Sequence, residues 1–292
     1  MANMREIRLR IKSIQDIMKI TNAMYLISSS KLRKARKKLN DVEPYFMKIQ
    51  ATIADIIRMS PNVNHKFFDE RPQIKHKKRG YIVITADKGL AGAYNHNVIK
   101  LAEQQLALHR NNTLFVVGQV GRKYFQRKNI SVDGEFLYTA QNPNLYRARS
   151  ITETVVDLFE KGHLDEFYVI YTDMVSTSKL NPAMIQLLPL QSKYLPDSAE
   201  DDKSYKLVAT YSPSPEDVLN HLVPNYVKGI IYSALIEAYS SEHSARMTAM
   251  DAATTSAKDM IKSLTLMYNR ARQASITQEI SEIVGGSKSF HK

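Results

Sequence analysis

Cysteine and tryptophan are both absent from the 292 residues of this chain. Without cysteine the chain can form no disulfide, no thiolate metal site and no cysteine nucleophile, and such a composition fits a reducing compartment. No apolar run approaches the roughly 18 residues that a membrane-spanning helix needs. The opening MANMREIRLR contains no apolar segment of a secretory signal. We therefore expect any membrane association to be peripheral.

Motifs of catalysis and cofactor binding are missing as well. The eight histidines include no pair at the i, i+4 spacing of a helical metal site. No G-x-S-x-G occurs, and nothing matches the phosphate-binding G-x-x-x-x-G-K-[ST]. Acidic runs such as Glu200 to Asp202 lie in a polar stretch, where solvated surface is the simpler interpretation. The sequence thus predicts no catalytic residue, no cofactor and no metal.

Acidic residues are outnumbered by basic ones, 29 against 41, which gives a formal net charge of +12. Such an excess suggests an acidic partner: nucleic acid, anionic lipid or acidic protein. Six basic residues fall within eight positions and are called the basic collar below: Lys31, Arg33, Lys34, Arg36, Lys37 and Lys38. A charge run is most often a solvated helix face. Six like charges repel one another, however, so that an acidic partner is a serious alternative.

Two interleaved apolar rows run through the first 58 residues at heptad spacing. They predict one helix about 80 Å long at ~1.5 Å per residue. A strict seven-residue period also implies a left-handed supercoil against another long helix. The first row is Met4, Ile11, Met18, Tyr25, Leu32, Leu39, Phe46 and Ile53, and the second is Ile7, Ile14, Thr21, Ser28, Ala35, Val42, Ile49 and Ile56.

The centre of the chain has the pattern of an α/β domain. After a linker over 59–79, continuous apolar runs at 81–86, 114–117 and 167–171 are typical of strands buried on both faces. Helical patterns at about 94–109, 120–128 and 149–161 alternate with them. The run 184–190 is expected to be an edge strand because of Pro189, and 205–210 is a possible last strand. We therefore predict a Rossmann-like, mainly parallel α/β domain over 80–212.

The loop Asp87 to Asn95 (DKGLAGAYN) follows the first strand, where α/β sheets commonly bind phosphates. It lacks the third glycine of G-x-G-x-x-G, so that a tight structural turn is the favoured interpretation. A nucleotide-dependent enzyme would have to use this loop.

A second long helix is predicted over 213–286. Ser214 is its N-cap, Pro215 stands at the first helical position, and no breaker follows Pro224 until Gly285-Gly286. We expect Pro224 to kink the helix near its start. Because the two long helices flank one inserted domain, the simplest pairing is an antiparallel coiled coil.

Four motifs resemble the gamma subunit of bacterial F-type ATP synthases. ITNAM (20–24) with SKLRKA (30–35) is similar to that family's N-terminal signature, and the loop 87–95 resembles its S-D-R-G-L-C-G-x-Y-N loop. SEHSARMTAM (241–250) and YNRARQASITQEI (268–280) match its C-terminal helix almost residue for residue. Lys88, Ala91 and Ala93 depart from the usual loop. The absence of a transit peptide and of a cysteine-bearing insert favours a bacterial origin.

The resemblance implies a non-catalytic central-stalk rotor that couples ion flow to ATP synthesis or hydrolysis. Its implied partners are the alpha and beta subunits of the catalytic hexamer, the epsilon subunit and the membrane c-ring, with no nucleic acid. Its implied place is the cytoplasmic face of the cell inner membrane, as a peripheral protein held only through the complex. A basic coiled-coil nucleic-acid-binding protein is the alternative, but the basic collar has no interleaved aromatic residues.

The resemblance also carries residue roles. It implies that Lys31, Arg33 and Arg36 face acidic loops of the catalytic subunits, with Met24 close by. Arg246 matches a position implicated in coupling of rotor to stator. Ser212 replaces a common acid, which weakens the expected contact with the membrane ring. Contacts with a catch loop of the catalytic subunit are implied for Arg272, Gln273 and Thr277, and contacts with the membrane ring or epsilon subunit for Tyr205 and Tyr211.

Overall fold

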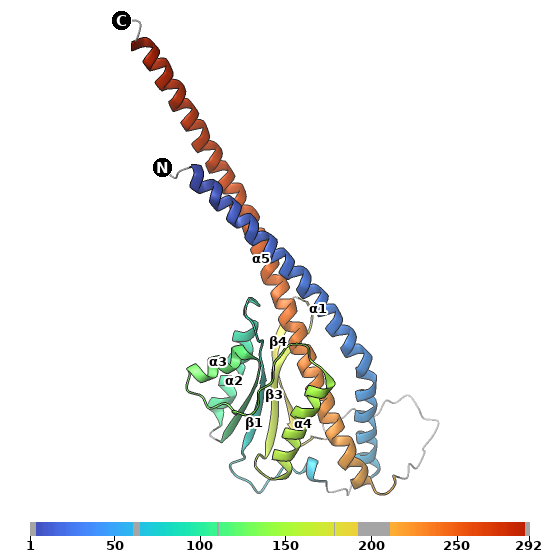
Figure 1. The fold of residues 1–292 in the computed structure, drawn as a ribbon. Coiled ribbons are helices and arrows are strands. Elements are labelled where there is room, and N and C mark those ends of the chain that lie inside the picture. The colour runs from blue at the N-terminus through green and yellow to red at the C-terminus, as the bar shows by residue number, and fades with distance from the viewer. Residues whose placement is uncertain (1–3, 61–64, 110, 178, 192–210, 290–292) are drawn as a thin grey trace. The chain divides into compact units, whose positions relative to one another are not determined.

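A computed structural model describes residues 4–60, 65–109, 111–177, 179–191 and 211–289. The elements in chain order are α1 (Met4–Met59), the short 3-10 helix η1 (Lys66–Phe68), β1 (Arg79–Ile84), α2 (Tyr94–Leu108), β2 (Asn112–Val117), α3 (Gln119–Arg127), α4 (Leu145–Glu160), β3 (Glu166–Met174), β4 (Leu180–Leu188) and α5 (Pro215–Ser289). Two very long helices thus flank a chain of alternating strands and shorter helices (Figure 1).

The chain divides into two compact units, and each long helix contributes a segment to both. The first unit comprises residues 1–28 and 246–292, and the second comprises residues 29–245. The domain boundaries expected from the sequence, with a linker over 59–79 and a central domain over 80–212, remain a prediction.

The second unit contains a four-stranded sheet in the order β2-β1-β3-β4. β1 pairs in parallel with β2 and β3, and β4 pairs antiparallel with β3 at the edge. This confirms the predicted mainly parallel α/β sheet. β4 is an edge strand, as Pro189 indicated, but it spans Leu180–Leu188 and not the expected 184–190.

Both faces of this sheet are covered, which is why its strands are continuously apolar. Along β1, Tyr81 and Val83 pack with residues of α2 and α3, whereas Ile82 and Ile84 pack with residues of α4, α5 and the later part of α1. Figure 1 shows the same layers, with α2 and α3 on one side of the sheet and α4 and α5 on the other.

Two hydrogen bonds of the Thr85 hydroxyl join the carboxyl end of β1 to the end of β2 and the start of α3. The hydroxyl of Thr85 donates to the carbonyl of Val117 at 2.9 Å and accepts from the amide of Gly121 at 3.0 Å. Gly118 caps α3 with a φ of 93°, and a Cβ at this position would lie 2.3 Å from the Thr85 carbonyl oxygen. Only glycine adopts this positive φ readily and has no Cβ to collide with the Thr85 carbonyl.

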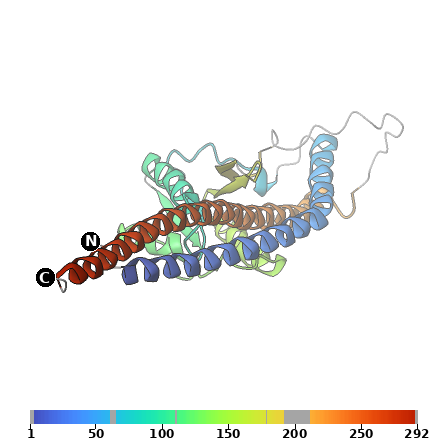
Figure 2. The same cartoon turned by 90° about the horizontal axis from the view of Figure 1, so that it is seen from above.

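The long helices lie side by side in each unit (Figures 1 and 2). In the first unit the hydroxyls of Thr21 and Thr254 are 2.8 Å apart, and the Arg8 guanidinium lies 5.4 Å from the centre of the Tyr268 ring. In the second unit the rings of Phe46 and Tyr232 are 6.5 Å apart. In both units residue numbers rise along one helix as they fall along the other, which confirms the antiparallel pairing.

All sixteen heptad positions of α1 are buried or half-buried. The two apolar rows form the seam along which α1 contacts α5. The burial of Ser28 and Ala35, two small residues in the middle of the second row, shows that α5 approaches α1 closely there. The heptad pattern therefore identified the contact face correctly along the whole of α1.

Pro44 lies inside α1, and the helix continues past it as the heptad rows predicted. Two local features differ from the expectations. α5 continues through Gly285-Gly286 to Ser289, so that its predicted end was wrong. In the predicted linker, Phe67 is buried against Phe159, with ring centroids 6.3 Å apart. The possible strand at 205–210 lies outside the described residues.

Candidate functional site

The basic collar is largely a solvent-facing surface of the second unit. Lys31, Arg33, Lys34, Lys37 and Lys38 are exposed, whereas Leu32, Ala35 and Leu39 between them are buried in the seam. The seam therefore dictates which side of α1 carries the charge. Five cations without an interposed acid form a strong positive field on one helix surface.

Part of the basic collar lines a hollow of about 220 Å³ in the second unit. Lys31, Lys34 and Lys38 recur at three-four spacing on one face of α1 and meet the turn Asn142-Pro143 that precedes α4. The floor includes apolar atoms of Ile236. A hollow with a cationic wall and a partly apolar floor suits an acidic segment that also carries apolar side chains. No pattern in the sequence indicated that Asn142 and Pro143 line this hollow together with the lysines.

Arg36 differs from the rest of the basic collar. Its guanidinium donates to Glu237 Oε1 of α5 at 2.6 Å and to the Met174 carbonyl of β3 at 3.1 Å. Burial raises the pKa of Glu237, and the charge of Arg36 only partly offsets this rise. The side chains of Arg36 and Glu237 are 34% and 15% exposed. Arg36 therefore joins three elements within the second unit, a role that the sequence did not reveal.

The candidate residues of the first unit lie along the two helix segments. Arg272, Gln273 and Thr277 are exposed on α5, so that their polar groups face solvent, and Met24 is half-buried on α1. Arg246 is 7% exposed and carries interactions within the chain, which makes it the most enclosed of the candidates.

Of the two tyrosines expected at a membrane-side contact, Tyr211 is half-buried and packs at the margin of the main core. Burial raises the pKa of its hydroxyl. Tyr205 lies outside the described residues.

The loop after β1 is organised by the Asp87 carboxylate. Its Oδ2 accepts from the amides of Ala140 and Gln141 at 3.0 and 3.1 Å and from the hydroxyl of Thr139, while Oδ1 accepts from the amide of Gln119 at 3.1 Å. These bonds tie the start of the loop to the first residue of α3 and to the segment before α4. The carboxylate thus holds the protein's own backbone, which supports the structural interpretation of the loop.

Within the described ranges, no group of three or more histidine, aspartate or glutamate side chains is arranged to hold a metal ion. No helix in the same part of the chain has the length and hydropathy to cross a bilayer.

The fold is shared with chains of two solved ATP synthase structures. It resembles a chain in the cryo-EM structure of the Tetrahymena thermophila mitochondrial ATP synthase central stalk and c-ring. The TM-score is 0.58 at 22% identity, with coverage of 80% of this chain and 99% of that one. A chain of the Euglena gracilis mitochondrial ATP synthase gives a TM-score of 0.53 at 19% identity, with coverage of 92% and 95%.

Comparison of the sequence with known proteins identifies the family more closely than the fold does. A family model described as ATP synthase matches residues 3–290. The ATP synthase gamma chain of Acetivibrio thermocellus is 48% identical over 99% of this chain and 100% of its own length. That of Ruminiclostridium cellulolyticum is 50% identical over 99% of both chains. A third relative, named ATP synthase gamma chain, sodium ion specific, comes from Acetobacterium woodii and is 43% identical over 99% of both chains.

The chain belongs to the ATP synthase gamma chain family. This confirms the resemblance carried by the four motifs and gives no support to the nucleic-acid-binding alternative.

Proposed function

We propose that the chain acts as the central-stalk rotor subunit of an F-type ATP synthase. In this role it couples transmembrane ion flow to ATP synthesis or hydrolysis on neighbouring subunits and makes or breaks no bond itself. The observation that carries the proposal is near-half identity to bacterial gamma chains over almost the full length of both proteins. The antiparallel helix pair adds a physical reason, because paired helices resist bending better than one and can transmit torque.

The basic collar supplies the proposed contact with the alpha and beta subunits. Lys31 and Arg33 are exposed and free to face acidic loops, and their attraction to carboxylates would act over about 10 Å at moderate salt. Arg36 contributes to this surface through its exposed part while its other contacts hold the second unit together. Met24 lies on the same helix, where an added charge would create an unwanted ion pair.

The exposed residues of α5 supply a second proposed contact. Arg272, Gln273 and Thr277 can make directional hydrogen bonds to a catch loop of a catalytic subunit, and charge-assisted bonds of this kind are strong enough to define a pause in rotation. Arg246, which is enclosed, would act on coupling by positioning its helix. Tyr205 and Tyr211 are proposed to contact the epsilon subunit or the c-ring. The complex would hold the chain peripherally at the cytoplasmic side of the cell membrane.

Co-purification tests the proposal. A tagged copy of the chain is expressed in its own cells, the membranes are solubilised in detergent, and the recovered proteins are identified by mass. Recovery of the alpha, beta, epsilon and c subunits in an ATP-hydrolysing complex is the expected result, and the purified chain alone should hydrolyse no ATP. Recovery of the chain with nucleic acid and without these subunits would contradict the proposal.

A further inference from the structure

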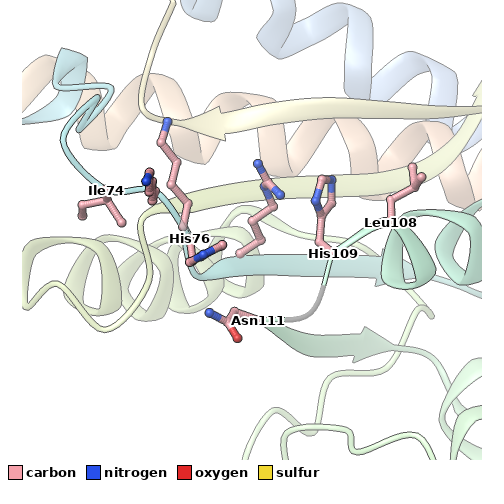
Figure 3. A pocket seen from close by; sticks show the side chains of 8 residues that line it. Ile74, His76, Leu108, His109 and Asn111 are labelled. Carbon is pink, nitrogen blue, oxygen red and sulfur yellow. The ribbon is translucent and has the colours of Figure 1, made fainter.

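A cationic pocket lies at the amino end of the parallel strands, opposite the end at which α/β sheets usually bind their ligands. It opens beside Arg79, the first residue of β1, and Asn111, which directly precedes β2. Figure 3 shows Ile74 and His76 at one end of the pocket and Leu108 and His109 at the other. The remaining lining residues are Lys75 and Lys77, which belong to the segment that leads into β1.

The lining of this pocket contains cations and imidazoles but no carboxylate among the described residues. The nearby acid is Glu166, which accepts from Lys77 at 2.9 Å and from Arg79 at 2.6 Å. One carboxylate thus balances one of these two cations. Lys75 and the second cation of the pair therefore leave the pocket with a net positive charge.

Hydrogen bonds from Asn112 hold the backbone at His109. Asn112 donates from its amide nitrogen to the carbonyls of His109 at 2.5 Å and of Leu106 at 3.0 Å, which fixes the turn between α2 and β2. Burial of the imidazole, and then the charge of Arg79, lower the pKa of His109. An imidazole beside a guanidinium and lysines is a donor set that suits an oxyanion with several acceptor atoms.

We propose that this pocket binds a phosphate-bearing anion, either a free polyphosphate or the headgroup of an anionic phospholipid. Its volume of about 650 Å³ is in the range of small-ligand sites and exceeds what a single phosphate fills. Arg79 offers a planar fork of donors, the lysines offer mobile point charges, and both suit phosphate oxygens. All of its lining belongs to the second unit, and none of the lining residues is used in the proposed rotor contacts.

Proton uptake should accompany binding. The anion would oppose the effect of Arg79 on the pKa of His109, so that the imidazole gains a proton as the ligand enters. Because the pKa of His109 in the free protein is lowered, affinity should rise as the pH falls toward that lowered pKa. Two charged groups near His109 have opposite effects on its pKa: Arg79 on β1 lowers it and Glu166 on β3 raises it. Lys75, His76 and Lys77 before β1 line the same pocket, and Glu103 on α2 lines a neighbouring hollow together with His109.

Two probes distinguish the two sources of phosphate. Isothermal titration of the full chain with inorganic pyrophosphate at low salt measures binding of a free anion. Sedimentation with vesicles of phosphatidylcholine, with or without phosphatidylglycerol, measures binding of a headgroup. The pocket variant is Lys75→Gln/His109→Gln. The matched control is Lys100→Gln/His96→Gln, which changes the same residue types at exposed positions of α2 outside the pocket.

We expect the pocket variant to bind the effective probe about tenfold more weakly, equivalent to about 1.4 kcal/mol, and the control to bind normally. Proton uptake, measured in buffers of different ionisation enthalpy, should disappear in the pocket variant. Pyrophosphate binding alone identifies a free anion, and vesicle binding that pyrophosphate displaces identifies a headgroup. If the double variant does not fold, the exposed Lys75→Gln substitution alone replaces it, with Lys100→Gln as control.

Three results would overturn the proposal. One is the absence of binding to both probes at low salt. Another is an equal loss of binding in the pocket variant and the control, which would attribute the effect to net charge. The third is tighter pocket binding of poly-glutamate than of pyrophosphate, because the site would then select carboxylates.

Discussion

At the level of single residues, the carboxylate of Glu166 binds several side chains at the amino end of the parallel strands. It is 7% exposed, and it accepts from Lys77, Arg79 and the hydroxyl of Tyr168. Burial opposes its charge, but these three hydrogen bonds prevail and hold the pKa of Glu166 below its usual value. Burial, and then the charge of Glu166 and the hydrogen bond to it, raise the pKa of the Tyr168 hydroxyl.

The lowered pKa of Glu166 makes a pH-dependent contribution to stability. Because the folded state favours the carboxylate, this contribution is fully present above the unfolded pKa of about 4.5 and is lost as the pH falls through the lower, folded pKa. Glu166→Gln should lower the free energy of unfolding at pH 7 by about 1–3 kcal/mol, because it leaves buried donors poorly paired. The deficit relative to wild type should shrink in acid.

Urea unfolding of both proteins at neutral and acidic pH measures this difference. Glu153→Gln is the matched control, since Glu153 forms an exposed pair with Arg149 one helical turn away. The control should follow wild type at every pH. A constant deficit of Glu166→Gln down to acidic pH would show that its ionisation is not coupled to folding.

At the level of elements, a close approach of the two long helices in the second unit depends on Gly229. A Cβ built there would lie 2.4 Å from Cδ1 of Phe46, whose buried ring also packs near Tyr232. The glycine therefore serves packing between helices, although it lowers the helical propensity of α5. The heptad rows predicted the contact face of α1 but not this pairing, because Gly229 and Phe46 are far apart along the chain.

We predict that Gly229→Ala destabilises the chain by about 1–3 kcal/mol through overpacking. In an exposed helix the same change would stabilise by about 1 kcal/mol. A double-mutant cycle with Phe46→Leu tests the cause by chemical denaturation, because a smaller partner should remove most of the penalty. An unchanged penalty in the Phe46→Leu background would place the conflict elsewhere.

At the level of the whole molecule, the basic collar combines two roles that charge counting cannot separate. Lys31 and Arg33 face solvent, whereas Arg36 pairs with Glu237 and the end of β3. Neutralising all three together would mix loss of a partner-facing charge with loss of an internal contact. Separate variants are therefore needed.

We predict that Lys31→Gln/Arg33→Gln slows ATP synthesis several-fold in the assembled complex at low salt and leaves the free energy of unfolding of the isolated chain unchanged. Added salt should reduce the difference from wild type, because screening weakens exposed charges. Lys48→Gln/Arg127→Gln removes equal charge at exposed positions outside the basic collar and is the control. Normal synthesis at low salt in the first variant would refute an electrostatic contact.

Arg36→Gln should show the opposite pattern in the isolated chain. It leaves Glu237 half-buried without its cation and should lower the free energy of unfolding by about 1–3 kcal/mol, a value reduced by the partial exposure of the pair. Urea unfolding measures the loss. Unchanged stability would mean that the pair adds nothing to the fold.

The predictable part of this protein is the part governed by short periods along the chain. The heptad rows identified every buried position of the α1 seam, and the continuous apolar runs located β1, β2, β3 and β4 within a few residues. The Asp87 loop could be tested for a phosphate motif, but its amide partners come from positions 119 and 140–141. No local pattern connects such distant segments.

By itself the sequence determined the two long helices, their seam, the buried parallel sheet and the family, because periodicity and motifs are local properties of the chain. Only the tertiary structure decided that Arg36 forms an ion pair within the second unit and that Asp87 accepts hydrogen bonds from the amides of distant segments. It also decided that residues before β1 and after α2 meet in one cationic pocket. Each of these depends on which distant segments the sheet and helices bring together, and that is fixed by packing of the whole unit.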